Sequence, residues 1–77
     1  MKKTGKLKYD HVSQRFQIVD GEENIIDSGL HCGESLEICL NEIWIPTRME
    51  MNLNREWYLV GIPGQGSDLE NFDVRTD

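Results

Sequence analysis

Alternating apolar and polar positions define the longest predicted strand of this chain, residues 43–51. Successive side chains of a strand point to opposite faces, so Ile43, Ile45 and Met49 fall on one side. The other side collects side chains of a different kind: Trp44, Pro46, Arg48 and Glu50. Pro46 has no amide hydrogen, which predicts that this strand lies at a sheet edge or is bent or bulged at that residue.

Shorter runs with the same period predict further strands on both sides of this one. They are rich in apolar residues and are bounded by turn-forming residues, which is typical of hairpins. The turns include DHVSQ at 10–14 and Asp20-Gly21. The predicted strands are the runs 6–9, 15–20, 25–26, 57–62 and 72–75.

The run 36–40 fits two periods. A helix over 35–41 would align Leu36 with Leu40, whereas a strand would align Leu36, Ile38 and Leu40 on one face. The two-residue break Asn41-Glu42, followed at once by an alternating run, favours the strand. We therefore expect an all-β domain of five or six antiparallel strands, curled into a small barrel of the Src-homology-3-like or Tudor-like kind. The alternative is an α+β fold with a short helix at 35–41.

Length and charge narrow the classes of protein to be considered. The 77 residues suit one domain, 1–77, of which 1–4 are expected to be flexible. Residues 1–8 hold four lysines, so the remaining 69 residues carry 4 basic against 14 acidic side chains, a net charge of −10. This balance disfavours nucleic-acid binding. The chain has no apolar run of about 20 residues and no secretory signal, so we expect a cytoplasmic protein without a membrane span.

The spacing of the histidines and cysteines along the chain does not fit a metal site or an activated thiol. They are His11, His31, Cys32 and Cys39, which form no Cys-x-x-Cys pair. Neighbouring residues of an extended chain point apart, so His31 is badly placed to activate Cys32. We expect no metal, no cofactor and no catalysis, with a thiol enzyme as the least favoured class.

Three segments resemble one uncharacterised family of small domain-of-unknown-function proteins from Firmicutes. They are GLHCGE at 29–34, WIPTRME at 44–50 and WYLVG at 57–61. The tail LENFDVR is similar to the ending of that family, in which glycine usually stands at the position of Asn71. The family is often found on integrative and conjugative elements. The resemblance implies bacterial origin, a mobile-element setting and a single stand-alone domain, and it brings no activity.

The face of residues 43–51 opposite the aliphatic side chains is the candidate binding surface. Its members are Trp44, Pro46, Arg48 and Glu50, with Trp57 or Tyr58 expected across the hairpin. Rings and a guanidinium side by side dominate the energetics of many interfaces. In a small barrel, however, the rings could equally plug the open ends, and Arg48 could simply pair with Glu50 or Glu37.

These patterns lead to two hypotheses about function. The preferred one is a non-catalytic module from a bacterial mobile element that binds a protein or peptide, or a second copy of itself. The alternative is an acidic nucleic-acid mimic that inhibits a host DNA-processing or defence protein. Mimicry requires clustered carboxylates, whereas a binding module requires a contiguous patch of rings.

Overall fold

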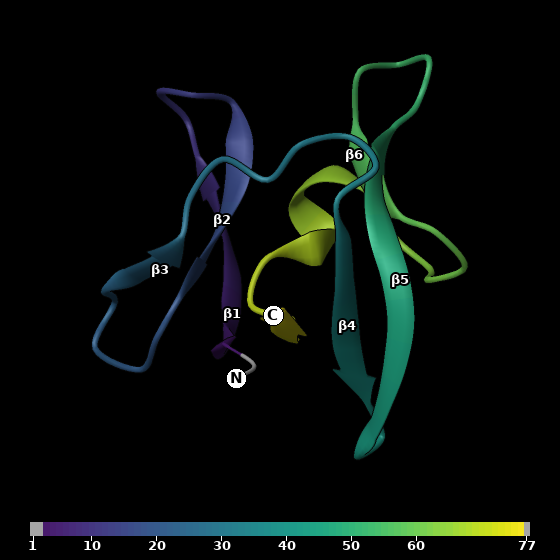
Figure 1. Ribbon diagram of the computed structural model, residues 1–77. Coiled ribbons are helices and arrows are strands. Elements are labelled where there is room, and N and C mark those ends of the chain that lie inside the picture. The colour runs from purple at the N-terminus through teal and green to yellow at the C-terminus, as the bar shows by residue number, and fades with distance from the viewer. Residues whose placement is uncertain (1–2, 77) are drawn as a thin grey trace.

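Seven antiparallel strands form one sheet in the order β3-β2-β1-β7-β4-β5-β6 (Figure 1). The computed structural model describes residues 3–76. The sheet curls into a half-barrel, because β3 and β6 at its two ends do not pair with each other within that range. The elements are β1 (Lys3–Asp10), β2 (Arg15–Val19), β3 (Ile25–Asp27), β4 (Ser35–Leu40), β5 (Ile43–Met51), β6 (Trp57–Leu59), the 3-10 helix η1 (Gly66–Leu69) and β7 (Asp73–Thr76).

Two aspartates shape the turns on either side of β2. The Asp10 carboxylate accepts hydrogen bonds from the Val12 amide at 3.1 Å and from the Ser13 hydroxyl at 2.8 Å. The Asp20 carboxylate accepts the amides of Glu22 and Asn24 at 2.8 and 2.9 Å. Turns of this kind are stabilised by short acceptor side chains that bind groups two to four residues ahead. β1 pairs with the whole of β2, so the predicted hairpin of these two strands is confirmed.

The β4–β5 hairpin decides between the strand and the helix at 35–41 in favour of the strand. Its two-residue turn has Asn41 at φ 51° and Glu42 at φ 66°. Two consecutive left-handed residues match the right-handed twist of the flanking strands. Leu36 and Ile38 then face the core, and the α+β alternative is wrong.

Pro46 lies where β5 has a free edge, as predicted. β4 pairs with the whole of β5 up to Arg48, whereas β6 covers only Met49 to Met51. The Arg48 carbonyl accepts the Val60 amide on the side away from β4. Because backbone groups two residues apart point the same way, the Pro46 nitrogen also faces that side, and no ladder hydrogen bond is lost.

The strand count is a correction: there are seven strands rather than five or six. The two shortest strands of the structure, β3 and β6, both pair with a neighbour, since Val19 lies opposite Ile25 and Met51 lies opposite Trp57. Within the segment 1–4, for which the sequence predicts flexibility, Lys3 and Thr4 belong to β1 and pair with β7. Residues 1 and 2 lie outside the described range.

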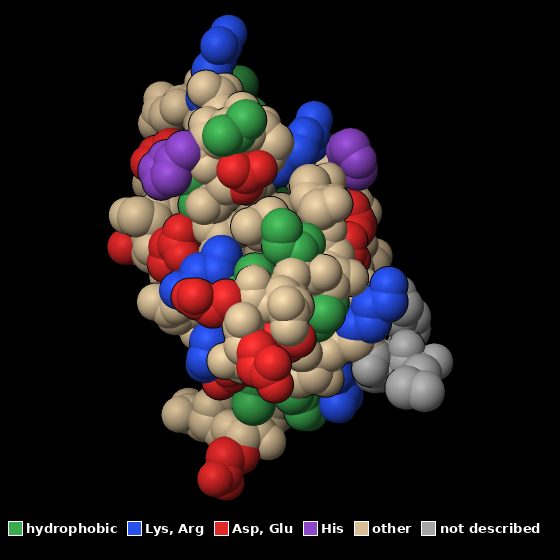
Figure 2. All heavy atoms as spheres, turned by 90° about the vertical axis from the view of Figure 1, so that its left-hand side faces the viewer, with side chains coloured by type: hydrophobic (Ala, Val, Ile, Leu, Met, Phe, Trp, Pro, Cys, Tyr) green, Lys and Arg blue, Asp and Glu red, His purple; other side chains and the backbone are tan. Residues whose placement is uncertain are grey.

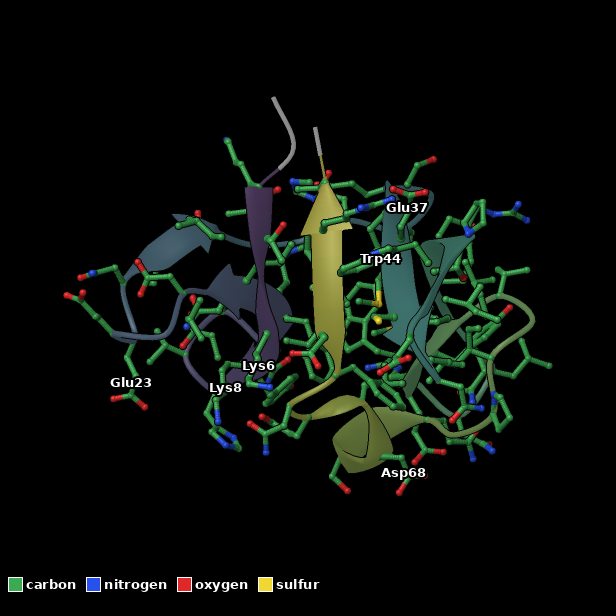
Figure 3. The ribbon with its side chains drawn as sticks, turned by 90° about the horizontal axis from the view of Figure 1, so that it is seen from below. Lys6, Lys8, Glu23, Glu37, Trp44 and Asp68 are labelled. Atoms are coloured by element: carbon green, nitrogen blue, oxygen red, sulfur yellow. The ribbon has the colours of Figure 1, made fainter. Side chains whose placement is uncertain are left out.

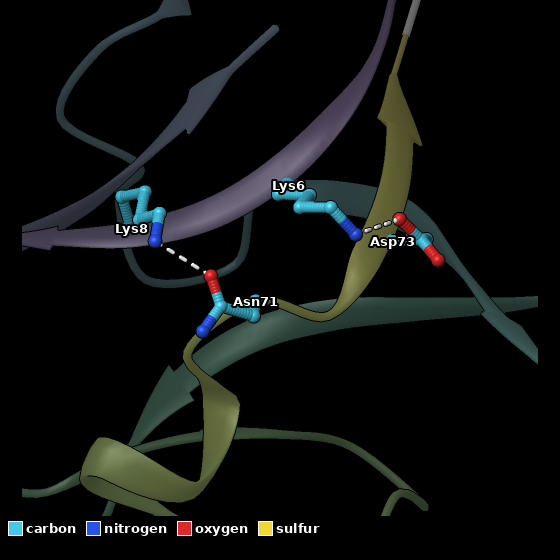
Figure 4. Close-up of polar contacts among 4 residues, drawn as sticks. All are labelled: Lys6, Lys8, Asn71 and Asp73. Atoms are coloured by element: carbon cyan, nitrogen blue, oxygen red, sulfur yellow. Dashed lines mark hydrogen bonds and ion pairs between the residues drawn. The ribbon is translucent and has the colours of Figure 1, made fainter. Parts of the chain in front are cut away.

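β7 joins two halves of the sheet. It pairs with β1 on one side and with β4 on the other, as expected for a final strand lying beside the first. Side chains reinforce the β1 side, where Lys6 Nζ lies 2.8 Å from Asp73 Oδ1 and Lys8 Nζ lies 2.6 Å from Asn71 Oδ1 (Figure 4). Asn71 has φ 70°, which explains why a residue tolerant of left-handed backbone stands there.

The core fills the concave side of the curled sheet. Its fully buried aliphatic side chains come from every strand but β3, and Phe16 packs among them. No helix in the described range is long and apolar enough to cross a membrane. The core residues are Leu7, Phe16, Ile18, Leu30, Leu36, Ile38, Met49, Trp57, Leu59, Leu69 and Val74.

Candidate functional site

Five of the six predicted surface residues share the outer face of the sheet. Met49 of β5 points into the core and is 0% exposed. The residues at even-numbered positions of this strand therefore point to the opposite, outer face. Tyr58 lies opposite Glu50 on β6 and joins this face. Pro46 and Arg48 are exposed, whereas Trp44, Glu50 and Tyr58 are half-buried. The strand pattern therefore predicted the composition of this face, apart from Trp57.

Trp44 is half-covered because Arg75 of β7 lies over its ring. The Arg75 Cζ atom is 4.2 Å from the ring centroid, and Arg75 Nε is 2.7 Å from Glu37 Oε1. Register explains the cluster, since Glu37 pairs with Arg75, and Trp44 pairs with Cys39 two residues further along β4 (Figure 3). A guanidinium held between an aromatic face and a carboxylate is a favourable arrangement for arginine.

Two further charged residues of the outer face, Arg48 and Glu50, pair with each other. Arg48 Nε lies 2.8 Å from Glu50 Oε2, one of the two pairings that the sequence left open. An exposed pair of this kind contributes little to stability, about 0–1 kcal/mol. The outer face is thus a mixed surface of rings and neutralised charges, with Pro46 as its exposed apolar member.

Trp57 does not belong to that face. It points into the concave side of the sheet with 6% exposure. Its indole Nε1 donates a hydrogen bond to the Gln14 carbonyl oxygen at 3.0 Å, and the Arg15 guanidinium carbon lies 6.0 Å from the ring centroid. Trp57 therefore closes the gap between β6 and the β1–β2 turn.

A hollow of about 330 Å³ opens beside Trp57, between the β1–β2 hairpin and the segment that carries β6 and η1. Rings wall it, because Tyr9 meets His11 edge to face with centroids 4.9 Å apart. Tyr9 also meets Phe16 edge to face at 5.2 Å. We call this space the seam hollow; its lining is Tyr9, His11, Phe16, Arg55, Glu56, Trp57, Gly66, Ser67 and Glu70.

Two carboxylates lie at the seam hollow. Glu70 Oε1 accepts the Tyr9 amide at 2.8 Å, which fixes that side chain. Glu56 is half-buried, and its carboxylate has no hydrogen bond or ion pair to any residue of the described range. It packs close to Gly66, where a Cβ would stand 3.4 Å from Glu56 Oε2. Arg55 lines the hollow as an exposed cation, likewise without an ion pair to described residues.

Comparison with known proteins places the chain in a family. Residues 5–76 match the domain of unknown function DUF5348. The chain belongs to this family. A crystal structure of a protein from Ruminococcus gnavus, a structural-genomics target, is similar with a TM-score of 0.80 and 36% identity. The similarity covers 96% of this chain and 100% of that one. Among curated proteins, no match was found.

Membership in the DUF5348 family confirms the part of the resemblance that concerns a domain of unknown function, and the similar protein from Ruminococcus gnavus comes from a Firmicutes organism. DUF5348 is described as a domain of unknown function, and the Ruminococcus gnavus protein is named without an activity. The function of this family member therefore has to be argued from its own surface.

The sequence analysis did not predict the seam hollow, although one pair of residues in its lining could be predicted from the sequence. The predicted hairpin around the turn 10–14 places Tyr9 opposite Phe16, as the structure confirms. Their meeting with Trp57 depends on the curl of the whole sheet, because 41 positions separate Phe16 from Trp57 in the chain. No local pattern reports such a contact.

A second hollow, of about 470 Å³, is also lined by Trp57. It brings together His31 and Cys32, together with Arg15 and Met51. Both cysteines are free; Cys32 is exposed, and Cys39 is half-buried on the outer face. Between residues 3 and 76, no group of three or more histidine, cysteine or acidic residues is placed to hold a metal ion.

Acidic side chains are not gathered into one ridge on the face formed by β2 and β3. Figure 2 shows aspartates and glutamates interspersed there with basic and hydrophobic side chains. A mimic of nucleic acid needs a continuous line of negative charge. This face does not favour the alternative hypothesis.

Proposed function

We propose that this DUF5348 protein is a non-catalytic module that binds a segment of a partner protein in the seam hollow. One observation carries the proposal: Tyr9, His11 and Trp57 surround an open space beside the carboxylate of Glu56, which has no partner among residues 3–76. Binding pockets are mainly apolar and hold a few polar groups that orient the ligand. Aromatic anchors in such pockets supply most of the binding energy of many interfaces.

The outer face of β5 is the second candidate surface. Exposed Pro46 beside the Trp44–Arg75 stack supports it. Arg48, Glu50 and Arg75 already have ion-pair partners there, whereas the Glu56 carboxylate has none in the part of the chain that the structure describes. A ligand there would have to compete with these pairs, so we place it after the seam hollow.

Several finer expectations accompany the proposal and stay predictions. They are a likeness to Src-homology-3 or Tudor barrels, a mobile-element setting and a cytoplasmic location. Self-association is another, although Tyr58 of β6 already makes a bridge to Gln65 along the outer edge of the sheet. An acidic inhibitor of a DNA-processing protein remains the alternative function, with the net charge of −10 beyond residue 8 as its support.

Selection from a random peptide library displayed on phage tests the proposal. Enriched peptides are expected to bind the wild type and to lose about tenfold or more in affinity for the double variant His11→Ala/Glu56→Gln, because truncated anchors typically cost more than about 1 kcal/mol. The matched control is Pro46→Ala/Arg48→Ala on the outer face, which should bind as the wild type does. Failure to enrich any peptide would contradict the proposal, and so would peptides that respond only to the outer-face variant.

A further inference from the structure

An arginine of this chain shows what a ring and a carboxylate can hold together. Arg75 places its guanidinium 4.2 Å from the centroid of Trp44 while its Nε lies 2.7 Å from Glu37. The planar guanidinium can lie on an aromatic face and still direct its N–H groups at a carboxylate. Both contacts use different parts of one side chain, so they do not exclude each other.

The seam hollow contains the same two elements without an arginine between them. Tyr9 and His11 present rings at 83° to each other, so that a flat group meets one ring face and one edge. The Glu56 carboxylate has no partner among the described residues, and Glu70 uses only Oε1 to accept the Tyr9 amide. A half-buried carboxylate beside rings lacks a donor that a ligand could supply.

Charge selects a cation as that ligand. Glu56 and Glu70 outweigh Arg55 at the hollow, and the chain carries a net −10 beyond residue 8. An anionic group would meet repulsion from both carboxylates and from the field of the whole domain. A cation is drawn in by both, and it gains further from the faces of the rings within about 6 Å.

Between the two cationic side chains of proteins, the geometry favours arginine. A lysine ammonium is a compact, strongly hydrated charge that would have to give up water to lie against Tyr9 or Trp57. A guanidinium is more weakly hydrated, and its parallel N–H groups can bind both oxygens of Glu56. The hollow, at about 330 Å³, accommodates a side chain of that length.

We propose that the seam hollow binds an arginine side chain of a partner protein, with Tyr9 and His11 as its aromatic walls and Glu56 as its carboxylate. This inference rests on the function proposed above and names the chemistry of its ligand. Arg55 lines the same space and opposes the ligand's charge. Glu56 is the residue on which discrimination between a cation and a neutral isostere depends.

Titration of ¹⁵N-labelled protein with three blocked pentapeptides tests the inference. Each peptide has glycines around one central residue, which is arginine, lysine or the neutral isostere citrulline. The two indole N–H signals separate the surfaces, because Trp57 borders the seam hollow and Trp44 lies on the outer face. The arginine peptide should shift the Trp57 indole signal and leave the Trp44 indole signal unchanged. We expect a Kd on the order of millimolar, because a single side chain makes few contacts.

Citrulline should bind at least about tenfold more weakly than arginine, and lysine should fall between them. Glu56→Gln should weaken the arginine peptide by a similar factor and abolish the preference over citrulline. Glu22→Gln, at the exposed turn before β3, removes one negative charge far from the seam hollow and should leave binding unchanged. Unshifted spectra outside the hollow would show that each variant is folded.

The inference would be overturned if the arginine peptide bound no more tightly than the citrulline peptide or the lysine peptide. It would also be overturned if Glu22→Gln weakened binding as much as Glu56→Gln does. The peptide selection distinguishes this failure from failure of the proposed function. If library peptides bind in the seam hollow but contain no arginine, the proposed binding function is supported and only the inference of an arginine ligand is wrong.

Discussion

Trp57 and Gln14 meet across the open side of the sheet, where the indole Nε1 donates to the Gln14 carbonyl oxygen at 3.0 Å. The two residues are 43 positions apart: Trp57 belongs to β6, at one end of the strand order, and Gln14 belongs to the β1–β2 turn in the other half of the sheet. A side-chain hydrogen bond thus does at this place what a ladder of backbone hydrogen bonds does in a closed barrel. Trp57 lines both hollows of the molecule described above, and Gln14 lines the second of them.

Trp57→Phe should destabilise the protein by about 1–2 kcal/mol, because phenylalanine cannot donate to Gln14 and leaves part of the indole volume empty. Urea unfolding followed by circular dichroism measures the effect. Trp44→Phe is the matched control, since it keeps a ring on the outer face and should cost less. A larger loss for Trp44→Phe than for Trp57→Phe would show that the closure contributes little.

Arg75 and Trp44 should be energetically coupled. We expect a double-mutant cycle with Arg75→Met and Trp44→Leu to give a coupling of about 0.5–1 kcal/mol, the usual range for a cation above a ring that is still in contact with water. Methionine retains much of the apolar stem of arginine, so the cycle isolates the guanidinium. A cycle between Arg48→Met and Trp44→Leu provides the comparison. Additivity in the Arg75 cycle would mean that the stack contributes no stability.

Gly5→Ala should destabilise the fold by about 1–3 kcal/mol, as overpacking does. A Cβ on this residue of β1 would collide with the Val19 carbonyl oxygen and stand 2.8 Å from Ile18 Cγ2. Gly21→Ala is the control, because a Cβ there meets nothing within 4 Å and the residue has no positive φ. Its effect should lie within about 0.5 kcal/mol. Thermal melting compares the two variants, and equal melting temperatures would contradict the packing argument.

Stability should fall at acid pH through the two turn aspartates. Hydrogen bonds from Asn24 and then Glu22 lower the pKa of Asp20, and hydrogen bonds from Ser13 and then Val12 lower the pKa of Asp10, in each case from 3.8. A lowered folded-state pKa means that the stabilisation is present above about pH 3.8 and is lost as the pH falls through the folded value.

Urea unfolding from pH 6 to pH 2 checks this expectation. The double variant Asp10→Ala/Asp20→Ala should show a smaller loss of stability below about pH 4 than the wild type, because the two hydrogen-bonded aspartates are no longer there to protonate. Glu22→Gln, whose side chain makes no hydrogen bond to described residues, should follow the wild-type profile. Parallel profiles for the wild type and the double variant would show that other acidic groups dominate.

Local patterns predicted the strands well because their causes are local. The alternation around Met49 determined which side chains face outward, and Asn41-Glu42 had the backbone preference that a tight hairpin requires. Trp57 was different: in the almost continuously apolar run WYLVGI, periodicity cannot tell the inner face from the outer one. Its position, and with it the seam hollow, follows from sheet curvature, which depends on all seven strands at once.

The place of β7 in the sheet has a consequence for biosynthesis. The fourth position in the strand order belongs to the last strand along the described chain, whose residue Thr76 pairs with Lys3. The hairpins on its two flanks can form while the ribosome is still translating, but no strand pairing joins them until residues 73–76 have emerged from the exit tunnel. Contacts between such remote segments slow folding, so this small domain should acquire its native state only after residues 73–76 have been synthesised.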